Sequence, residues 1–356
     1  MLTTMKVLIT GNLGYVGPIV ARHFRAAFAD ATLVGFDTGF FAGCLLDPRY
    51  CPEVILDAQY YGDVRRPPAE LFEGVDVVVQ LAAISNDPMG NAFEAVTDEI
   101  NARAVADFAR RAKAAGVSSF ILASSCSVYG AGGNDAKSES SALNPLTAYA
   151  RSKIAAERAL SHLADPGFKI TCLRFATACG FSERIRLDLV LNDFVASALT
   201  IGKIVILSDG TPWRPLIHVK DMARAIEWAA NRESTGDSSF LVLNVGSNDW
   251  NYRVRDLAEG VRLQLGNVEI SLNANAAPDQ RSYRVDFNLF QSLAPMHQPV
   301  ETLATAVQDL AHGLRSRGFA VADFRASNYI RLKVLSDLRN AGRLSDELFW
   351  TVSRAP

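Results

Sequence analysis

The sequence has no excess of either charge. Its 356 residues include 36 Lys and Arg and 38 Asp and Glu, which gives a formal net charge of -2. A protein that neutralises a nucleic-acid backbone usually carries a basic excess. Nucleic acid is therefore not an expected partner, although a small anionic ligand needs only a few local cations.

Cysteine is also scarce, and its spacing is uninformative. The five cysteines are an odd number and contain no Cys-x-x-Cys pair; they are Cys44, Cys51, Cys126, Cys172 and Cys179. Neither a disulfide framework nor a closed zinc site is expected from such a set, and no metal is predicted. Buried free thiols in a reducing cytoplasm fit these observations best.

Long hydrophobic runs are missing as well. No apolar run reaches the length that spans a bilayer, and Met1 to Lys6 lacks the cationic stretch and apolar core of a signal peptide. With 49% hydrophobic and 21% charged residues, the composition is that of an ordinary globular protein. We therefore expect a cytoplasmic protein without a membrane partner.

What the sequence does contain is an alternation of short apolar runs and amphipathic segments. The runs predict buried strands at Lys6–Thr10, Thr32–Phe36, Val75–Leu81, Ser119–Ala123 and Lys169–Leu173. The segments between them predict helices at Pro18–Phe28, Ala102–Ala115 and Ala148–Leu163. This order is typical of an α/β protein with a Rossmann-like, doubly wound parallel sheet, which we place in residues 1–180.

Beyond about Gly180 the segments become shorter and the loops longer, as in Asp209–Pro215 and Asn273–Asp279. We expect a smaller substrate-binding lobe over residues 181–356, with some later segments returning to the first domain. Tyr329–Asn340 and Ser345–Trp350 are predicted to form one or two C-terminal capping helices.

A glycine-rich turn, Gly11-Asn12-Leu13-Gly14-Tyr15-Val16-Gly17, directly follows the first predicted strand and precedes a helix. Glycines at this spacing allow a sharp turn, a close approach to a pyrophosphate and packing of the helix on the sheet. The free N–H groups at the helix N-terminus then favour an anion. The turn therefore predicts a dinucleotide cofactor.

Asp37 ends the second predicted strand, 20–26 residues after the glycines. A carboxylate there binds the ribose diol of NAD and repels the additional phosphate of NADP. No arginine stands beside Asp37 in the sequence, so NAD is the predicted cofactor. Asp63 and Val64, after Gly62, are candidate contacts to its adenine.

Tyr149 and Lys153 lie four residues apart on a predicted helix, so their side chains share one face. A tyrosine with an ordinary pKa near 10 is a weak base at neutral pH, and a neighbouring cation lowers that pKa. Ser125 follows a predicted strand and can bind the same substrate oxygen as the tyrosine. The three residues form a candidate catalytic set.

With these motifs the sequence resembles the extended short-chain dehydrogenase/reductase family, and within it the NAD-dependent nucleotide-sugar epimerases and dehydratases. The resemblance covers nearly the whole chain. Besides the motifs above it rests on Leu81-Ala82-Ala83, Asn101, Ser125-x-x-Val128-Tyr129-Gly130, Leu173-Arg174-Phe175 and the run from Trp213 to Asp221.

The resemblance implies a role for each matching position. Ser125, Tyr149 and Lys153 would be catalytic. The cofactor would contact Gly11, Asn12, Leu13, Gly14, Tyr15, Val16, Gly17, Asp37, Asp63, Val64, Leu81, Ala82, Ala83, Asn101, Ser124, Tyr149, Lys153 and Phe175. A nucleotide-diphosphate sugar would contact Ser85, Ser125, Thr177, Asn192, Arg214, Asp279 and Arg281.

One departure from the family pattern narrows the function. The 4,6-dehydratases carry an Asp-Glu pair after the catalytic Ser or Thr, where this sequence has Cys126 and Ser127. The related decarboxylases have a glutamate at the position of Ser127, whereas 4-epimerases show a small residue followed by Ser or Thr. We therefore predict an NAD-dependent nucleotide-sugar epimerase acting at C4.

Two other functions stay open at this point: a sugar dehydrogenase or ketoreductase with net redox change, and a non-catalytic NAD-responsive regulator. In the family, the helices that match Ala102–Ala115 and Arg151–Leu163 form a dimer interface, so a homodimer is expected; burial of their apolar faces inside a monomer is the alternative. The sequence identifies neither the sugar nor the nucleotide.

Overall fold

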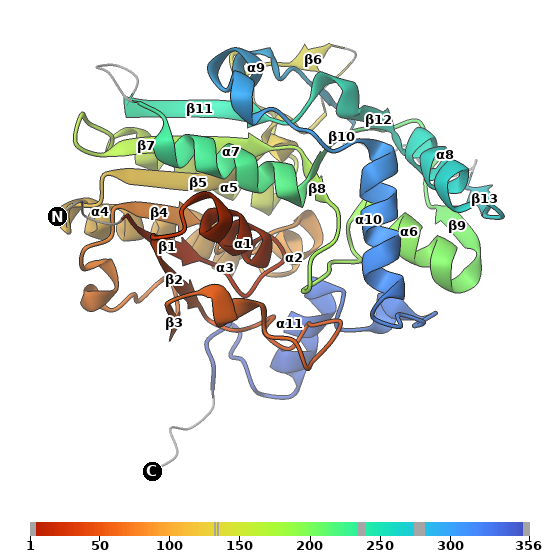
Figure 1. Ribbon diagram of the computed structural model, residues 1–356, viewed down its shortest axis with the longest axis horizontal. Helices are drawn as coiled ribbons and strands as arrows, with labels where there is room; N and C mark the ends of the chain where they lie inside the picture. The colour runs from red at the N-terminus through yellow and green to blue at the C-terminus, as the bar shows by residue number, and fades with distance from the viewer. Residues whose placement is uncertain (1–4, 132, 134, 234–238, 274–281, 352–356) are drawn as a thin grey trace.

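A seven-stranded sheet forms the centre of the computed structural model, which describes residues 5–131, 133, 135–233, 239–273 and 282–351 (Figure 1). Every neighbouring pair is parallel. The strands, in spatial order, are β11 (Phe240–Val245), β7 (Lys169–Phe175), β5 (Ser119–Ser125), β4 (Val77–Gln80), β1 (Lys6–Thr10), β2 (Thr32–Asp37) and β3 (Ala58–Tyr61). The strand order reverses between β1 and β4, which is where ligands bind in such sheets.

The sheet separates two hydrophobic cores, because successive side chains of a strand point to opposite faces. Val7 and Ile9 belong to one core, whereas Leu8 belongs to the other. The helices that cover the sheet are α1 (Gly17–Ala27) and α7 (Val219–Asn231) on the first face, with α4 (Val105–Ala114) and α5 (Ala148–Ser161) on the second (Figure 1). The Rossmann-like, doubly wound parallel sheet predicted from the sequence is confirmed.

A group of helices lies beside the carboxyl ends of the strands, at the right of Figure 1. It contains α6 (Val190–Ile201), α8 (Val254–Leu265) and α10 (Leu303–Arg315), with a parallel pair formed by β9 (Lys203–Ile206) and β13 (Glu269–Leu272). A three-stranded sheet connects this lobe to the main sheet; its strands are β8 (Thr177–Cys179), β10 (Trp213–His218) and β12 (Asn251–Arg253). Both α7 and β11 return from this later part of the chain to the main sheet.

Shorter elements complete the fold. Near β11 lie β6 (Ala136–Lys137), β14 (Arg284–Val285) and α9 (Asn288–Leu293) (Figure 1). After β4 the chain forms α2 (Asp87–Ala92), α3 (Glu94–Asp98) and a π-helical segment, Glu99–Ala104, that continues into α4.

The C-terminal region contains one of the two possible capping helices, α11 (Arg331–Asn340). Ser345–Trp350 is not a helix: Leu344 pairs with Trp350 in an antiparallel bridge, and Leu348 has a positive φ of 57°. A left-handed backbone at Leu348 cannot belong to an α-helix. This segment is instead a turn whose Leu344 and Leu348 side chains are buried in the second core.

The helices of the predicted dimer interface bury their apolar residues against this chain's own sheet. Phe108 of α4 and Leu160 of α5 are completely buried. The exposed positions carry Arg110, Arg151 and Arg158 instead. The dimer expected from the resemblance stays a prediction.

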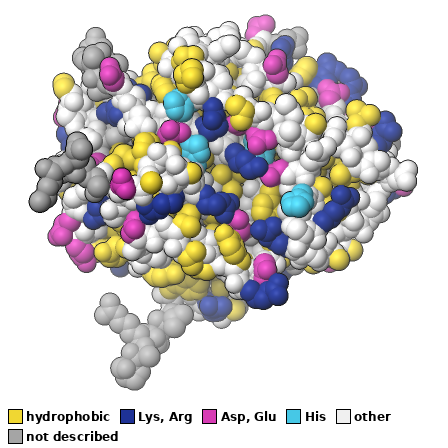
Figure 2. Space-filling model, in the orientation of Figure 1, with side chains coloured by type: hydrophobic (Ala, Val, Ile, Leu, Met, Phe, Trp, Pro, Cys, Tyr) yellow, Lys and Arg dark blue, Asp and Glu magenta, His cyan; other side chains and the backbone are white. Residues whose placement is uncertain are grey.

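Both signs of charge are present on the face of the molecule drawn in Figure 2, where basic and acidic side chains are interspersed. Within the described part of the chain, no helix is both long and apolar enough to span a bilayer. The cysteines are free thiols, of which Cys51 alone is exposed.

Candidate active site

A cavity of about 930 Å³ opens at the carboxyl ends of the central strands. One side is formed by the glycine-rich turn and the ends of β2, β4 and β5, and the other by segments of the C-terminal half. Its volume is at the upper end of the range for ligand sites. The cavity brings together most of the residues that the sequence predicts to bind cofactor or substrate.

The glycine-rich turn has the geometry of a pyrophosphate cradle. Gly11 has a positive φ of 70°, and a Cβ on it would lie 2.5 Å from the backbone nitrogen of Ala82. A Cβ on Gly17 would overlap the backbone of Asn12. Side chains at these positions would therefore displace the turn from the sheet. Gly11, Gly14, Tyr15 and Val16 line the cavity, whereas Asn12, Leu13 and Gly17 lie behind this wall.

Asp37 is held in place at the end of β2 by two backbone bonds. Its Oδ2 accepts a hydrogen bond from the backbone N–H of Leu13 at 3.0 Å, and its Oδ1 accepts one from Gly39 at 2.7 Å. Burial raises the pKa of this carboxyl, while the two bonds act in the opposite direction. Asp37 lines the cavity beside the glycine-rich turn, as a ribose-binding acid must. Asp63, Val64, Leu81, Ala82 and Ala83 line the same side.

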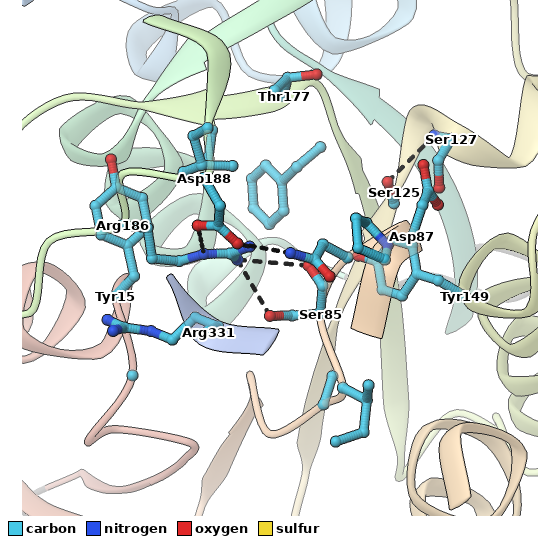
Figure 3. Close-up of a pocket in the computed structure, with 18 of the residues that line it drawn as sticks. Tyr15, Ser85, Asp87, Ser125, Ser127, Tyr149, Thr177, Arg186, Asp188 and Arg331 are labelled. Carbon is cyan, nitrogen blue, oxygen red and sulfur yellow. Dashed lines mark hydrogen bonds and ion pairs between the residues drawn. The ribbon is translucent and has the colours of Figure 1, made fainter. Parts of the chain in front are cut away.

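Ser125, Tyr149 and Lys153 meet at the inner end of the cavity, where β5 faces α5. The Lys153 Nζ donates a hydrogen bond to the Ala123 carbonyl at 2.8 Å and lies 5.6 Å from the centre of the Tyr149 ring. Figure 3 shows Tyr149 and Ser125 on the same side of the cavity. The candidate catalytic set therefore comes together in space.

Burial dominates the electrostatics of this set. It raises the pKa of Tyr149 to about 12, while a hydrogen bond with Ser125 and the charge of Arg186 act to lower it. That Lys153 lowers the pKa of Tyr149 stays a prediction. Burial also lowers the pKa of Lys153 to about 8, against the effect of Glu157.

A buried network of hydrogen bonds and one ion pair lies next to the catalytic set. Ser124 Oγ donates to Glu157 Oε1 at 2.5 Å, and Glu157 forms an ion pair with Arg174 at 2.7 Å. Arg174 then donates to the Tyr129 hydroxyl at 3.0 Å. Arg174, on β7, and Tyr129, in the turn after β5, carry part of the family resemblance, and through Glu157 they connect both segments to α5. Ser124 also lines the cavity, together with Phe175.

Two of the predicted ligand contacts are behind the cavity wall. The Asn101 amide accepts a bond from the Ile84 N–H at 2.8 Å and donates to the Ile84 carbonyl at 2.9 Å. Asn192 accepts from the Gly180 N–H at 3.1 Å and donates to the Tyr15 hydroxyl at 3.0 Å. Both side chains are completely buried. They position residues that line the cavity, and whether either touches a ligand stays a prediction.

Some of the remaining predicted substrate contacts line the cavity, and the others lie outside the described residues. Ser85, Thr177 and Arg214 line the cavity. Asp279 and Arg281 lie outside the described residues, as does most of the predicted loop Asn273–Asp279. His218 is completely buried and caps α7 by accepting the Lys220 N–H.

Sequence reasoning missed a group of charged residues on the C-terminal side of the cavity. Arg186 forms a two-pronged ion pair with Asp188, with Nε–Oδ1 and Nη2–Oδ2 distances of 3.0 and 2.9 Å. Arg186 also donates to Ser85 Oγ at 3.1 Å, and Asn86 donates to Asp188 at 2.6 Å (Figure 3). The alternation of charges in Arg184-x-Arg186-x-Asp188 was the available signal. Arg331 also lines the cavity, and no pattern in the sequence around it indicates this.

The fold and site now allow comparison with known proteins. The model of the NAD-dependent epimerase/dehydratase family matches residues 7–246. The chain belongs to this family, and it is an NAD-dependent enzyme of the epimerase/dehydratase type.

Individual relatives include both reaction types. The chain is 27% identical over 284 residues to the UDP-glucose 4-epimerase of Corynebacterium glutamicum, covering 74% of this chain and 81% of the relative. It is 26% identical over 253 residues to the dTDP-glucose 4,6-dehydratase of Streptomyces griseus, covering 68% and 74%.

Solved structures confirm the fold. MoeE5 in complex with UDP-glucuronic acid and NAD aligns with a TM-score of 0.74 and 24% identity, covering 87% of this chain and 99% of that one. The NAD-dependent NDP-hexosamine 5,6-dehydratase TunA aligns with a TM-score of 0.76 and 21% identity, covering 89% and 99%. Part of this chain therefore has no counterpart in either neighbour.

Proposed function

We propose that this protein is a nucleotide-sugar 4-epimerase that oxidises and re-reduces the same carbon of its substrate. The proposal depends on the two residues that follow Ser125, which are Cys126 and Ser127. Cys126 is completely buried, its thiol donates to the Arg174 carbonyl at 3.0 Å, and burial raises its pKa far above neutrality. It cannot serve as the acid that a 4,6-dehydratase of this family carries there.

The cavity residues fit the cofactor of the family. The glycine-rich turn lets its backbone approach a pyrophosphate, the half-buried Asp37 lines the cavity beside the turn, and Lys153 places a cation 5.6 Å from the centre of the Tyr149 ring. Bound NAD would supply the hydride acceptor and, through the positive charge of its nicotinamide ring, an attraction that favours the tyrosine phenolate.

The protein residues then act on a single sugar hydroxyl. Tyr149 removes the hydroxyl proton as the carbon–hydrogen bond breaks, and Ser125 holds the reacting oxygen by a hydrogen bond. Such general-base assistance contributes about 10²–10⁴ to the rate. After the keto-sugar has rotated in the cavity, the hydride returns to the opposite face of C4 while Tyr149 returns the proton to the oxygen. The sugar is then released with inverted configuration at C4.

The substrate diphosphate is assigned to Arg214, with Ser85 and Thr177 nearer the sugar. Arg214 comes from β10, which crosses from the main sheet to the second lobe and lines the outer part of the cavity. A guanidinium suits phosphate oxygens because its donors form a rigid fork. Asp279 and Arg281 stay predicted contacts of the same ligand.

The first test is the identity of small molecules released when freshly purified protein is denatured. Near-stoichiometric NAD supports an enzyme that recycles its own hydride, and a co-released nucleotide sugar identifies the substrate class. Protein that loses NAD and needs an external supply for each turnover would favour the dehydrogenase or ketoreductase.

The second test distinguishes the reaction types. Protein is incubated with UDP-glucose, UDP-N-acetylglucosamine and dTDP-glucose in D₂O, and products are followed by NMR. An epimerase gives the C4 epimer without deuterium, because the hydrogen returns directly. A 4-keto-6-deoxy product that contains deuterium would show a dehydratase and overturn the proposal, and Tyr149→Phe serves as the inactive control. The absence of all turnover with retained NAD would instead support a regulator.

A further inference from the structure

An arginine from near the end of the chain forms part of the cofactor cavity. Arg331, the first residue of α11, is 1% exposed and lines the cavity. Its Nη2 donates to the carbonyl oxygens of Arg184 at 2.7 Å and Ile185 at 3.1 Å, and its Nη1 donates to Asn328 at 3.3 Å. The guanidinium carbon lies 4.9 Å from the centre of the Phe41 ring.

Arg331 differs from the other buried arginines nearby in the partners of its guanidinium group. Arg184 and Arg186 each form an ion pair with a carboxylate. Within the described ranges, every hydrogen bond that Arg331 makes goes to a backbone carbonyl, and no carboxylate forms an ion pair with it. Burial lowers the pKa of Arg331 to about 10, while Asp188 attracts the Arg331 cation without contacting it and Arg184 and Arg186 repel it. A buried charge without a directly bound counter-ion is costly. An anion in the cavity would offset that cost.

The position of Arg331 indicates which anion this is. Phe41, on which it stacks, follows the ribose-binding Asp37 by four residues, so Arg331 lies at the cofactor side of the cavity. The same cavity contains the glycine-rich turn, whose backbone approaches the pyrophosphate. Arg186, on the adjoining wall, lies close enough to both Tyr15 of the turn and Tyr149 to influence their pKa values. Figure 3 shows Arg331 on the Tyr15 side of the cavity, away from Ser125 and Tyr149.

A strap of polypeptide, defined here as residues 328–351, holds Arg331 in this position. The Trp350 Nε1 donates to the Thr38 carbonyl at 2.7 Å, and its ring packs on Phe40 with 5.7 Å between ring centres. Thr38 and Phe40 both line the cavity. The strap therefore covers the loop that follows β2, next to Asp37, the predicted contact of the cofactor ribose.

Further along, the strap is fixed to the neighbouring loop. Arg65 donates to the Glu347 carbonyl at 2.7 Å and stacks on Phe349 with 3.5 Å between the guanidinium carbon and the ring centre. Arg65 also forms an ion pair with Asp63, the predicted adenine contact, at 2.6 Å. Leu335, Leu344 and Leu348 anchor the strap in the second hydrophobic core. The strap lies beyond the residues matched by the family model.

We propose that Arg331 binds the pyrophosphate of NAD and that the strap retains the cofactor between turnovers. The proposal deepens the proposed function, since an enzyme that regenerates its own NAD gains from not releasing it. Retention is measured without any sugar, so failure of the epimerase proposal would leave this test unaffected.

The test uses Arg331→Gln in the full chain, with Arg339→Gln as the matched control. Arg339 lies on the same helix but stacks on Phe93, outside the cavity. Each protein is loaded with NAD and desalted, and NAD release is followed after dilution. Loss of a hydrogen bond to a charged group corresponds to about 10- to 100-fold weaker binding. We expect Arg331→Gln to release NAD faster by this factor, and Arg339→Gln to match the unaltered protein.

Arg331 could instead bind the diphosphate of the nucleotide-sugar substrate. Equilibrium binding of UDP to the NAD-loaded proteins distinguishes this possibility from binding of the NAD pyrophosphate. Unchanged UDP affinity together with faster NAD release supports the proposal. Weaker UDP binding with unchanged NAD release would assign Arg331 to the substrate, and selective loss of NADP binding would place it at a ribose phosphate. Either result overturns the proposal, as does a folded Arg331→Gln protein that releases NAD at the original rate.

Trp350→Ala provides a second, independent variant in case removal of Arg331 prevents folding. It removes the contacts with Thr38 and Phe40 and leaves Arg331 in place. We expect faster NAD release, with the far-ultraviolet circular dichroism of the unaltered chain. A folded Trp350→Ala protein that retains NAD as long as the unaltered protein would overturn the role of the strap.

Discussion

The two sides of the cavity are built in different ways. The cofactor side is built from the carboxyl ends of neighbouring strands of one sheet: Gly11 directly follows β1, and Asp37 and Ser125 are the last residues of β2 and β5. The C-terminal side gathers Arg186, Arg214 and Arg331 from segments far apart in the chain. Local sequence patterns are thus sufficient to locate the first side, whereas the second depends on how distant segments pack.

The largest expected effect is on the cofactor side. Tyr149→Phe removes the hydroxyl that exchanges a proton with the sugar and leaves the ring in place. We expect turnover to fall by about 10²–10⁴, with NAD content unchanged. Single-turnover kinetics and NAD analysis of the same preparation measure both quantities. Near-normal turnover would exclude Tyr149 as the acid–base group.

The next largest effect is on stability and concerns the buried network of Ser124, Glu157, Arg174 and Tyr129. Glu157→Gln removes the charge that compensates the buried Arg174. We expect a loss of about 3 kcal/mol in the free energy of unfolding, because it leaves a buried cation unpaired. Glu94→Gln breaks the exposed ion pair with Arg151 and should change stability little. Urea denaturation measures the free energy of unfolding of both variants. Equal denaturation midpoints for the two variants would contradict a structural role for the network.

On the C-terminal side, Arg214→Gln should weaken UDP binding by about 10- to 100-fold, the range for a hydrogen bond to a charged group. NAD content should not change. Arg284→Gln is the matched control, because Arg284 stacks on the adjacent Trp213 but does not line the cavity. Calorimetric titration with UDP gives the answer. If both variants bind UDP like the unaltered protein, the diphosphate lies elsewhere.

The smallest effect is a pH dependence of stability from Lys153. Because burial lowers its pKa to about 8, the unfolded chain binds more protons than the folded chain between about pH 8 and the ordinary lysine pKa of 10.5. The stability of the unaltered protein relative to Lys153→Met should therefore rise with pH in this window, by at most about 1.4 kcal/mol per pH unit. Parallel curves for the two proteins would show that Lys153 is not desolvated.

The structure brings into one cavity the predicted residues whose motif and structural context are adjacent in the sequence. The glycine-rich turn, Asp37 and the Tyr149–Lys153 pair each need only one strand or one helix to acquire their geometry. Asn101 and Asn192 are different: both match positions of the family, but their amides are hydrogen-bonded to protein groups behind the cavity wall, which no local pattern indicates.

The sequence by itself determined the parallel α/β fold, the NAD site and the candidate catalytic set, because strand periodicity, glycine conformation and the spacing of one helical turn are local properties. Tertiary structure alone decided the rest. It set the burial that raises the pKa of Tyr149, paired Arg186 with Asp188, and carried Arg331 to the cofactor side. Burial and electrostatic pairing depend on every neighbour in space, and no local pattern records which distant segment supplies them.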